Sequence, residues 1–326
     1  MRLDPYNKLN LSGAVKAAPI LQIAEKRRIM MRTVNWGIIG LGLISKEFMI
    51  PEMLKSDICR ITALGSRSKI ADDYLPEAKH LTYDELFEDP DVEAVYIAVP
   101  NALHAELAIK AMKHGKHVLC EKPMACTKEE GELMAAVAAE NHVLLMEAFM
   151  YRYGENFRKL NEILSSGRLG KTVGMQGNHG YTLDWASPAR EDPKLGGGCL
   201  YDVGCYVIDC MNYVMGKQDA KVASGSASLK IKGGVDWHAA ADVQYDDGVC
   251  ACIQSWFDGA QEQRMLIVGE KDVCVIPDIF EPAEGEELYR VEAEEFSRAI
   301  RGEQSYIVPL EDTMRNLEVL EMLLSK

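Results

Sequence analysis

The sequence lacks several features that would assign it to a class at once. Its nine cysteines are an odd number at irregular spacing, and no Cys-x-x-Cys pair occurs. We therefore expect reduced thiols and no disulfide framework. No run of 18 apolar residues is present, which argues against a membrane span. The seven histidines show no two-histidine, one-carboxylate spacing, so no catalytic metal is expected.

Basic residues are outnumbered by acidic ones. The 326 residues include 36 Lys and Arg against 50 Asp and Glu, a net charge of −14. Such an acidic chain is not suited to binding nucleic acid or an anionic membrane. The length predicts about two domains. We expect a soluble, cytoplasmic protein.

Residues 1–32 differ from the rest, with seven basic and only two acidic residues. They contain no uninterrupted apolar core, which a signal peptide requires. Met30 and Met31 stand just before the first expected strand. We expect residues 1–32 to be an added or upstream segment outside the fold. An organelle presequence is the alternative.

Apolar strands alternate with helical patterns over residues 33–150. The expected strands are 34–39, 59–64, 94–99, 117–120 and 143–146, and the expected helices are 44–55, 83–87, 102–112 and 128–140. Strands that are apolar on both faces indicate a parallel sheet covered on both sides. The first domain is therefore predicted to be a doubly wound Rossmann domain.

Residues 151–326 are richer in glycine and turns. Two hairpins are predicted, 238–245 with 249–257 and 265–268 with 273–276, followed by helices 292–300 and 310–324. The fold class is α/β, with a C-terminal α+β domain built on a large, mostly antiparallel open sheet. One face should carry helices, and the other could pair with a second copy in a homodimer or homotetramer. The last helix could pack back on the first domain. The glutamate-rich segment 281–295 is expected to be a solvated face.

A glycine-rich turn joins the first strand to the first helix. It comprises Gly40, Leu41, Gly42, Leu43 and Ile44, followed by Ser45. In this context Gly40 permits a tight turn, and Gly42 lets a pyrophosphate approach the backbone at a helix N-terminus. Ser45 stands at the third glycine position and is small enough to keep helix and strand close. The alternative is an incidental glycine-rich turn.

The end of the second strand indicates which dinucleotide binds. NAD-binding proteins carry an acidic residue there for the ribose 2′-hydroxyl. This chain has Ser66 and Arg67 instead, and Arg is suited to a 2′-phosphate. NADP is therefore favoured, and NAD stays possible, because Arg67 could instead stack on the adenine.

A catalytic group is predicted from Glu121-Lys122-Pro123 and a second, glycine-rich segment. Lys122 follows a parallel strand, where ligands bind in open α/β sheets, and could move a proton while a hydride moves. Asp202 and Tyr206 are four residues apart and would share one helix face. The alternatives are a surface turn at Lys122 and, at 202–206, a helix N-terminus with a core tyrosine.

These segments resemble the Gfo/Idh/MocA oxidoreductases from about residue 33 onward. The motifs that carry the resemblance are GLGLIS, AVYIAVPNALH, HVLCEKPMA, MEAFMYRY and GGGCLYDVGCYVID. The resemblance implies a Rossmann domain, an open-sheet domain and a cofactor between them, with Lys122 as the acid/base residue. It also implies a set of residues lining the cofactor cleft, namely Val99, Pro100, Asn101 and His104, with Glu121 near the nicotinamide ribose and Trp185 and Arg190 approaching the cleft.

The position of Tyr206 is histidine in many members of that family. Tyrosine there is similar to the glucose–fructose oxidoreductase and dihydrodiol dehydrogenase branch, which includes xylose dehydrogenase-like members, and unlike the inositol dehydrogenases. We therefore expect an NAD(P)-dependent oxidoreductase acting on a sugar, a polyol or a vicinal diol. Tyr206 would orient the reacting oxygen, and Asp202 would hold the network. A non-catalytic NADP-dependent sensor and a nicotinamide-dependent glycosidase are the alternatives. Specificity is expected to lie in loops 176–195 and 232–238.

Overall fold

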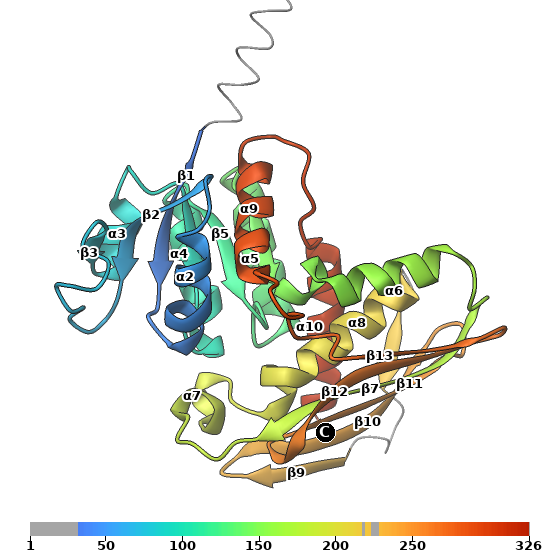
Figure 1. Ribbon diagram of the computed structural model, residues 1–326. Helices are drawn as coiled ribbons and strands as arrows, with labels where there is room; N and C mark the ends of the chain where they lie inside the picture. The colour runs from blue at the N-terminus through green and yellow to red at the C-terminus, as the bar shows by residue number, and fades with distance from the viewer. Residues whose placement is uncertain (1–31, 217–218, 223–227, 326) are drawn as a thin grey trace, which may run out of the picture.

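The computed structural model describes residues 32–216, 219–222 and 228–325. The expectation about residues 1–32 therefore lies outside the described residues, except at Arg32. Two sheets, each with its own helices, lie next to each other (Figure 1).

The first sheet has six strands, all parallel, in the order β3-β2-β1-β4-β5-β6. Its strands are β1 (Val34–Ile39), β2 (Cys59–Gly65), β3 (Lys79–Leu81), β4 (Ala94–Ile97), β5 (His117–Glu121) and β6 (Leu145–Ala148). This is the Rossmann strand order. Its topological switch point, where the order of successive strands reverses, lies between β1 and β4. The predicted parallel sheet is confirmed. The short edge strand β3 was not expected from the sequence.

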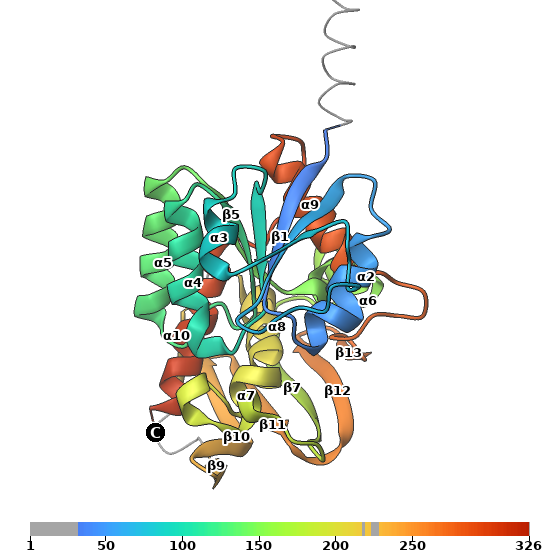
Figure 2. The ribbon, with the colours of Figure 1, turned by 90° about the vertical axis from the view of Figure 1, so that its left-hand side faces the viewer.

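Helices cover both faces of this sheet (Figure 2). The connections between its strands contain η1 (Ser45–Met49), α2 (Ile50–Met53), α3 (Tyr83–Glu88), η2 (Asn101–Leu103), α4 (His104–Lys113) and α5 (Lys128–Glu140). The segment expected as one helix over 44–55 begins instead with π-helical turns in η1. Helix α9 (Leu288–Ile300), from the end of the chain, packs against α2, β2 and β5.

The second sheet has seven strands and is mixed. Its strands are β7 (Thr172–Thr182), β8 (Ala220–Val222), β9 (Ser228–Lys232), β10 (Val235–Tyr245), β11 (Cys250–Trp256), β12 (Asp258–Gly269) and β13 (Val273–Pro277). Both predicted hairpins form, β10 with β11 and β12 with β13. Every pair is antiparallel except β11 with β7, so the predicted mostly antiparallel sheet is confirmed.

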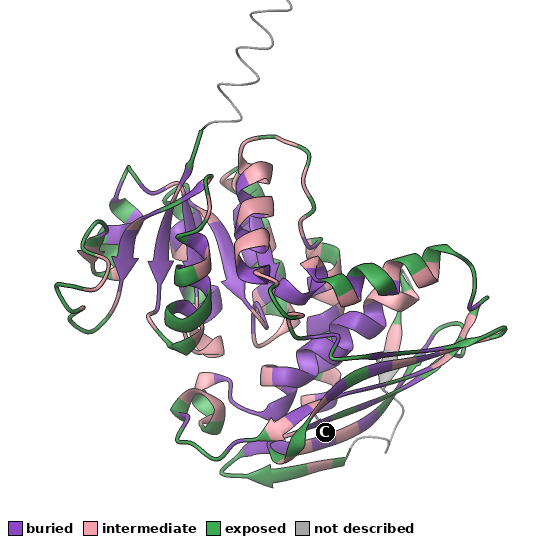
Figure 3. Cartoon of the chain, in the orientation of Figure 1, coloured by how far each residue is buried: buried purple, intermediate pink, exposed green. Residues whose placement is uncertain are grey.

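Among the described residues, the helices that pack on the second sheet lie on one of its faces. Before and after β7 the chain forms η3 (Met150–Tyr153), α6 (Glu155–Ser165), α7 (Pro188–Glu191), η4 (Pro193–Leu195), η5 (Leu200–Gly204) and α8 (Cys205–Met215). Both η5 and α8 pack on β7 and β11. Side chains along β11 and β13 alternate between buried and exposed, which leaves the outer face of the sheet open (Figure 3).

The two closing helices join the sheets. Helix α10 (Leu310–Leu324) packs against α8 and also against α5 of the first sheet. In α9 the expected solvated face is wrong for Glu292, which is fully buried. The cause is its position between Leu288 and Phe296, four residues away on either side and both buried. All nine cysteines are free thiols in the structure.

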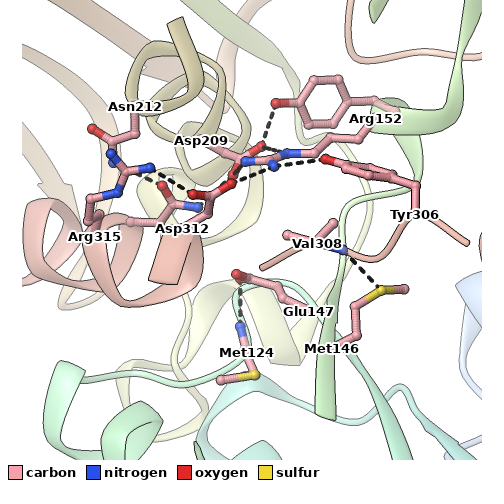
Figure 4. Close-up of polar contacts among 12 residues, drawn as sticks. Met124, Met146, Glu147, Arg152, Asp209, Asn212, Tyr306, Val308, Asp312 and Arg315 are labelled. Carbon is pink, nitrogen blue, oxygen red and sulfur yellow. Dashed lines mark hydrogen bonds and ion pairs between the residues drawn. The ribbon is translucent and has the colours of Figure 1, made fainter. Parts of the chain in front are cut away.

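A buried ionic network fastens η3 to α8 and α10 (Figure 4). The Arg152 guanidinium donates to both carboxylate oxygens of Asp209 at 2.5 and 2.8 Å, and to Asp312 at 2.8 Å. Tyr151 donates to Asp209 at 2.5 Å, and Asn316 donates to the same carboxylate at 2.6 Å. The network fixes α8, whose first turns carry part of the site described next.

Candidate functional site

Two adjoining cavities lie between the sheets. The first, of about 420 Å³, opens at the carboxyl ends of β1, β2, β4 and β5. The second, of about 500 Å³, lies over β7 and is walled by α8 and by residues 280–289. Four residues line both cavities: Ile44, Lys122, Arg190 and Asp202. A molecule in one cavity would therefore meet a molecule in the other at these side chains.

The glycine-rich turn after β1 forms one wall of the first cavity. Gly40 has φ +89°, and a Cβ there would come within 2.3 Å of the Ala98 carbonyl oxygen, so only glycine fits. A Cβ on Gly42 would meet nothing within 4 Å. Leu41, Leu43 and Ile44 complete this wall.

Ser45 has a role that its size alone did not predict. Its buried hydroxyl donates to the Gly40 carbonyl oxygen at 2.7 Å. This bond closes the turn on the first helical residue and holds the open backbone of Gly42 toward the cavity.

Ser66 and Arg67 lie at the end of β2 and line the same cavity, together with Ser68 and Tyr83. Arg67 is exposed and lies close to the Tyr83 hydroxyl. Burial raises the pKa of Tyr83, and the Arg67 charge opposes that rise. No acidic side chain stands on this stretch from Ser66 to Ser68.

The segment after β4 supplies Val99, Pro100 and Asn101 to the first cavity. His104 does not line it, contrary to expectation. Its ring is fully buried beneath the wall, with Nδ1 2.9 Å from the Pro123 carbonyl oxygen and Nε2 2.9 Å from the Val99 carbonyl oxygen. His104 therefore ties the loop after β4 to the loop after β5, because the helix α4 that begins with it turns its first residue inward.

Lys122 lies where the two cavities meet. Its Nζ donates to the Asp202 backbone oxygen at 2.6 Å and lies 3.9 Å from Asp202 Oδ1. The same nitrogen is 4.8 Å from the centroid of the Tyr206 ring, a cation–π distance. Glu121 is buried beside it, accepting from the Tyr96 hydroxyl at 2.5 Å and from the Lys122 amide at 3.2 Å. Burial raises the pKa of Glu121, and the Lys122 charge opposes the rise.

The Asp202 carboxylate is surrounded by Tyr181, Arg190 and Lys122. Its Oδ2 accepts from the Tyr181 hydroxyl at 2.6 Å and from Arg190 Nε at 2.9 Å. Burial would raise the pKa of Asp202, but the charges of Lys122 and Arg190, with these hydrogen bonds, outweigh it and lower the pKa. The carboxylate is therefore ionised and holds Lys122 and Arg190 in place.

Tyr206 and Trp185 both line the second cavity and not the first. Tyr206 and Asp202 face the same cavity, as their spacing predicted. Trp185 was expected near the cofactor. It stacks instead on Tyr181 in the wall of the second cavity, with ring centroids 5.6 Å apart and planes 10° apart. Trp185 is 49% exposed.

The glycines before η5 place the helix that carries Asp202. Gly198 has φ +120°, and a Cβ there would lie 2.0 Å from Asp236 Oδ1. Asp236, at the start of β10, is buried and accepts from the Leu200 amide at 2.7 Å. The helix expected after the glycines begins as π-helical turns, Leu200–Gly204, a form frequent at functional sites. Asp236 was missed because its partner is 36 residues away.

Two features are absent from the described residues. Within residues 32–216, 219–222 and 228–325, no three His, Cys, Asp or Glu side chains form a group able to hold a metal ion. In the same residues no helix is both long and apolar enough to cross a membrane.

Comparison with known proteins agrees with the fold. Residues 34–149 match the family described as "Oxidoreductase family, NAD-binding Rossmann fold", and residues 157–274 match the "GFO/IDH/MocA C-terminal domain". KijD10, a 3-ketoreductase from Actinomadura kijaniata solved with NADP and TDP-benzene, is similar with a TM-score of 0.79 at 23% identity, over 90% of this chain and 98% of that one. An aldose-aldose oxidoreductase from Caulobacter crescentus has a TM-score of 0.78 at 23% identity, over 90% and 97%.

Three sequence relatives match between 75% and 89% of the chain. D-xylose 1-dehydrogenase (NADP(+)) 2 of Haloferax volcanii is 29% identical, over 88% of this chain and 95% of that protein. Trans-1,2-dihydrobenzene-1,2-diol dehydrogenase of Bos taurus is 31% identical, over 75% and 74%. An uncharacterized oxidoreductase of Rhizobium meliloti is 30% identical, over 89% and 96%. Both family domains are present in order, and the chain belongs to the Gfo/Idh/MocA family of oxidoreductases.

Proposed function

We propose that this protein is an NADP-dependent oxidoreductase that transfers a hydride to or from a sugar, polyol or vicinal diol, with Lys122 as its acid/base residue. The observation that carries the proposal is the position of Lys122 Nζ, at the junction of two adjoining cavities. Only a group at that junction can act on a substrate in one cavity while a cofactor occupies the other.

The first cavity fits a dinucleotide on its own geometry. Gly40, in a positive-φ turn that only glycine fits, and the open Gly42 form a cradle at a helix start, which suits a pyrophosphate. Ser66 and Arg67 fit a ribose 2′-phosphate, and no carboxylate at the end of β2 would repel it. The Haloferax relative is named as an NADP(+) enzyme, and KijD10 was solved with NADP. We therefore assign NADP, with NAD as the weaker ligand.

When bound, the nicotinamide supplies the hydride acceptor or donor. The protein supplies the proton transfer. In oxidation Lys122 acts as the neutral amine and takes the proton of the substrate hydroxyl, and in reduction it acts as the ammonium and gives a proton to the carbonyl oxygen. Asp202, held by Tyr181 and Arg190, keeps Lys122 turned toward the second cavity. The Tyr206 ring lies against Lys122 Nζ, and its hydroxyl is assigned to orienting the reacting oxygen.

The second cavity and the relatives favour a polyhydroxy substrate. Its wall combines the polar groups of Lys122, Asp202 and Arg190 with aromatic rings such as Trp185 and Tyr206. Relatives are named for D-xylose, for a dihydrobenzene diol and for 1,5-anhydro-D-fructose. Sugars and vicinal diols share adjacent oxygens on a ring with apolar faces, which this wall matches.

A direct experiment measures absorbance at 340 nm with NADP and a panel of sugars and diols. The proposal predicts substrate-dependent NADPH formation with at least one panel member, and the reverse reaction with the product. A sensor would bind NADP and turn over nothing. A nicotinamide-dependent glycosidase would release sugar with no net change at 340 nm.

We also propose that the chain folds as a cofactor domain, 33–150, and a substrate and oligomerisation domain, 151–326. The open outer face of the second sheet would pair with a second copy, because a wide sheet face is otherwise left to solvent. Nine free thiols suit a reducing compartment, so we place the protein in the cytoplasm. Light scattering of the purified chain would separate dimer from tetramer.

A further inference from the structure

His179 is a second polar residue aimed at the substrate cavity. It lies in β7 and lines the second cavity, with its ring stacked on Phe280 at 5.2 Å and 15°. Its ring centroid is 5.4 Å from that of Tyr206. Lys122 Nζ is 4.8 Å from the same Tyr206 ring. His179 and Lys122 therefore share one aromatic neighbour in the wall of one cavity.

His179 and its two neighbours across the sheet have buried polar atoms without hydrogen-bond partners in the described residues. Its Nδ1 is enclosed and has no hydrogen-bond partner in the described part of the chain. The neighbouring strands place Ser255 and Gln263 directly beside it in register, and each also has a buried side-chain oxygen without a partner there. Buried unpaired polar atoms are rare in folded proteins. A row of three across β11, β7 and β12 indicates that ordered water or a bound ligand completes their hydrogen bonding.

The protonation state of His179 suits ligand binding and not proton transfer. Burial, and then the Lys122 charge, lowers the pKa of His179 to about 3. The imidazole is therefore neutral at ordinary pH and offers one donor and one acceptor. A substrate hydroxyl can donate and accept, so it can pair with a ring nitrogen of His179 in the cavity wall. His179 cannot replace Lys122 as the proton carrier.

We propose that His179 binds the substrate hydroxyl on the carbon next to the reacting carbon, and so selects compounds with vicinal oxygens. The proposal rests on the function proposed above, in which Lys122 acts on the reacting oxygen. Both side chains line the second cavity and lie next to the Tyr206 ring, so a substrate that presents one oxygen to Lys122 can present a neighbouring oxygen to His179. Two oxygens on adjacent carbons are the closest pair that a polyol provides.

The test compares D-xylose, a substrate named for one relative at its C1 position, with 2-deoxy-D-xylose. The analogue lacks only the hydroxyl next to the reacting carbon. We expect His179→Phe to lower kcat/KM for D-xylose by about 10- to 100-fold and to change kcat/KM for the analogue by less than about threefold. His179→Gln, whose amide reaches toward the position of Nε2, should recover part of the loss. The pH profile of kcat should not move, because Lys122 is unchanged.

A matched control is His114→Phe, the same change on an exposed histidine outside both cavities. It should leave both substrates unaffected. An equal loss on both substrates with His179→Phe, or no loss on either, would overturn the role of His179 alone. If the unmodified protein reduces no NADP with D-xylose or any other panel compound, the proposed function fails first, and this inference fails with it.

Discussion

Glu147 gives a pH dependence of stability that follows from its surroundings. It lies in β6, is 1% exposed, and accepts from the Met124 amide at 2.9 Å through Oε1, whereas Oε2 has no partner in the described residues. Burial raises the pKa of Glu147 to about 7, although the hydrogen bond from the Met124 amide opposes the rise. The ordinary value is 4.5. Between these two values the unfolded chain has released a proton that the folded chain retains.

Because the folded chain retains this proton, its free energy of unfolding falls as pH rises from about 4.5 to about 7. The fall is about 1.4 kcal/mol per pH unit and totals about 3 kcal/mol above pH 7. Glu147→Gln keeps the shape and the Met124 hydrogen bond but cannot ionise. We expect its free energy of unfolding to match that of the unmodified protein near pH 4.5 and to exceed it by about 3 kcal/mol at pH 8.

Denaturant unfolding at pH 5, 6, 7 and 8 measures this difference directly. Glu140→Gln, at an exposed position, serves as the control and should give a curve parallel to that of the unmodified protein. The reasoning is refuted if the Glu147→Gln curve is also parallel, because the folded protein would then carry an ionised Glu147 at no cost.

Three further predictions concern the cofactor cradle and the ionic network. NADP should bind at least about tenfold more tightly than NAD, a difference of about 1.4 kcal/mol in binding free energy. The double substitution Ser66→Asp with Arg67→Ala should reverse this order in a fluorescence titration. Equal affinities of the unmodified protein for the two cofactors would contradict the prediction. Gly42→Ala should keep the melting temperature and weaken NADP binding, whereas Gly40→Ala should lower the melting temperature, and the opposite pattern would exclude the cradle. Arg152→Met should lower the free energy of unfolding by about 3–5 kcal/mol, because it leaves a buried carboxylate without its cation, and a change below about 1 kcal/mol would exclude a stabilising network.

The parallel sheet could be predicted because its strands are continuous apolar runs between helical patterns. Helices 128–140 and 310–324 were predicted with the bounds that the structure has. Strand β3 could not be predicted, because Lys79–Leu81 has no apolar run and is held by pairing with β2 alone. Glu292 was misjudged because an acidic residue on an apolar helix face looks solvated until the packing of that helix is known.

Some residues of the candidate site could be predicted from local motifs, and others could not. Lys122, Asp202 and the Gly40 turn stand in local motifs, so their sequence context predicts them. Tyr181 and His179 lie on a strand without such a motif, and only the fold brings them beside Asp202 and Tyr206.

The most direct test of the account is single-turnover hydride transfer by Lys122→Ala, followed at 340 nm with the best substrate of the panel and with NADP affinity measured separately. The account predicts nearly unchanged affinity and a rate lower by a factor on the order of 10²–10⁴. Lys122→Arg should not restore the rate, since guanidinium keeps its proton, and Tyr206→Phe should lose less. Transfer by Lys122→Ala at the rate of the unmodified protein would contradict the central claim.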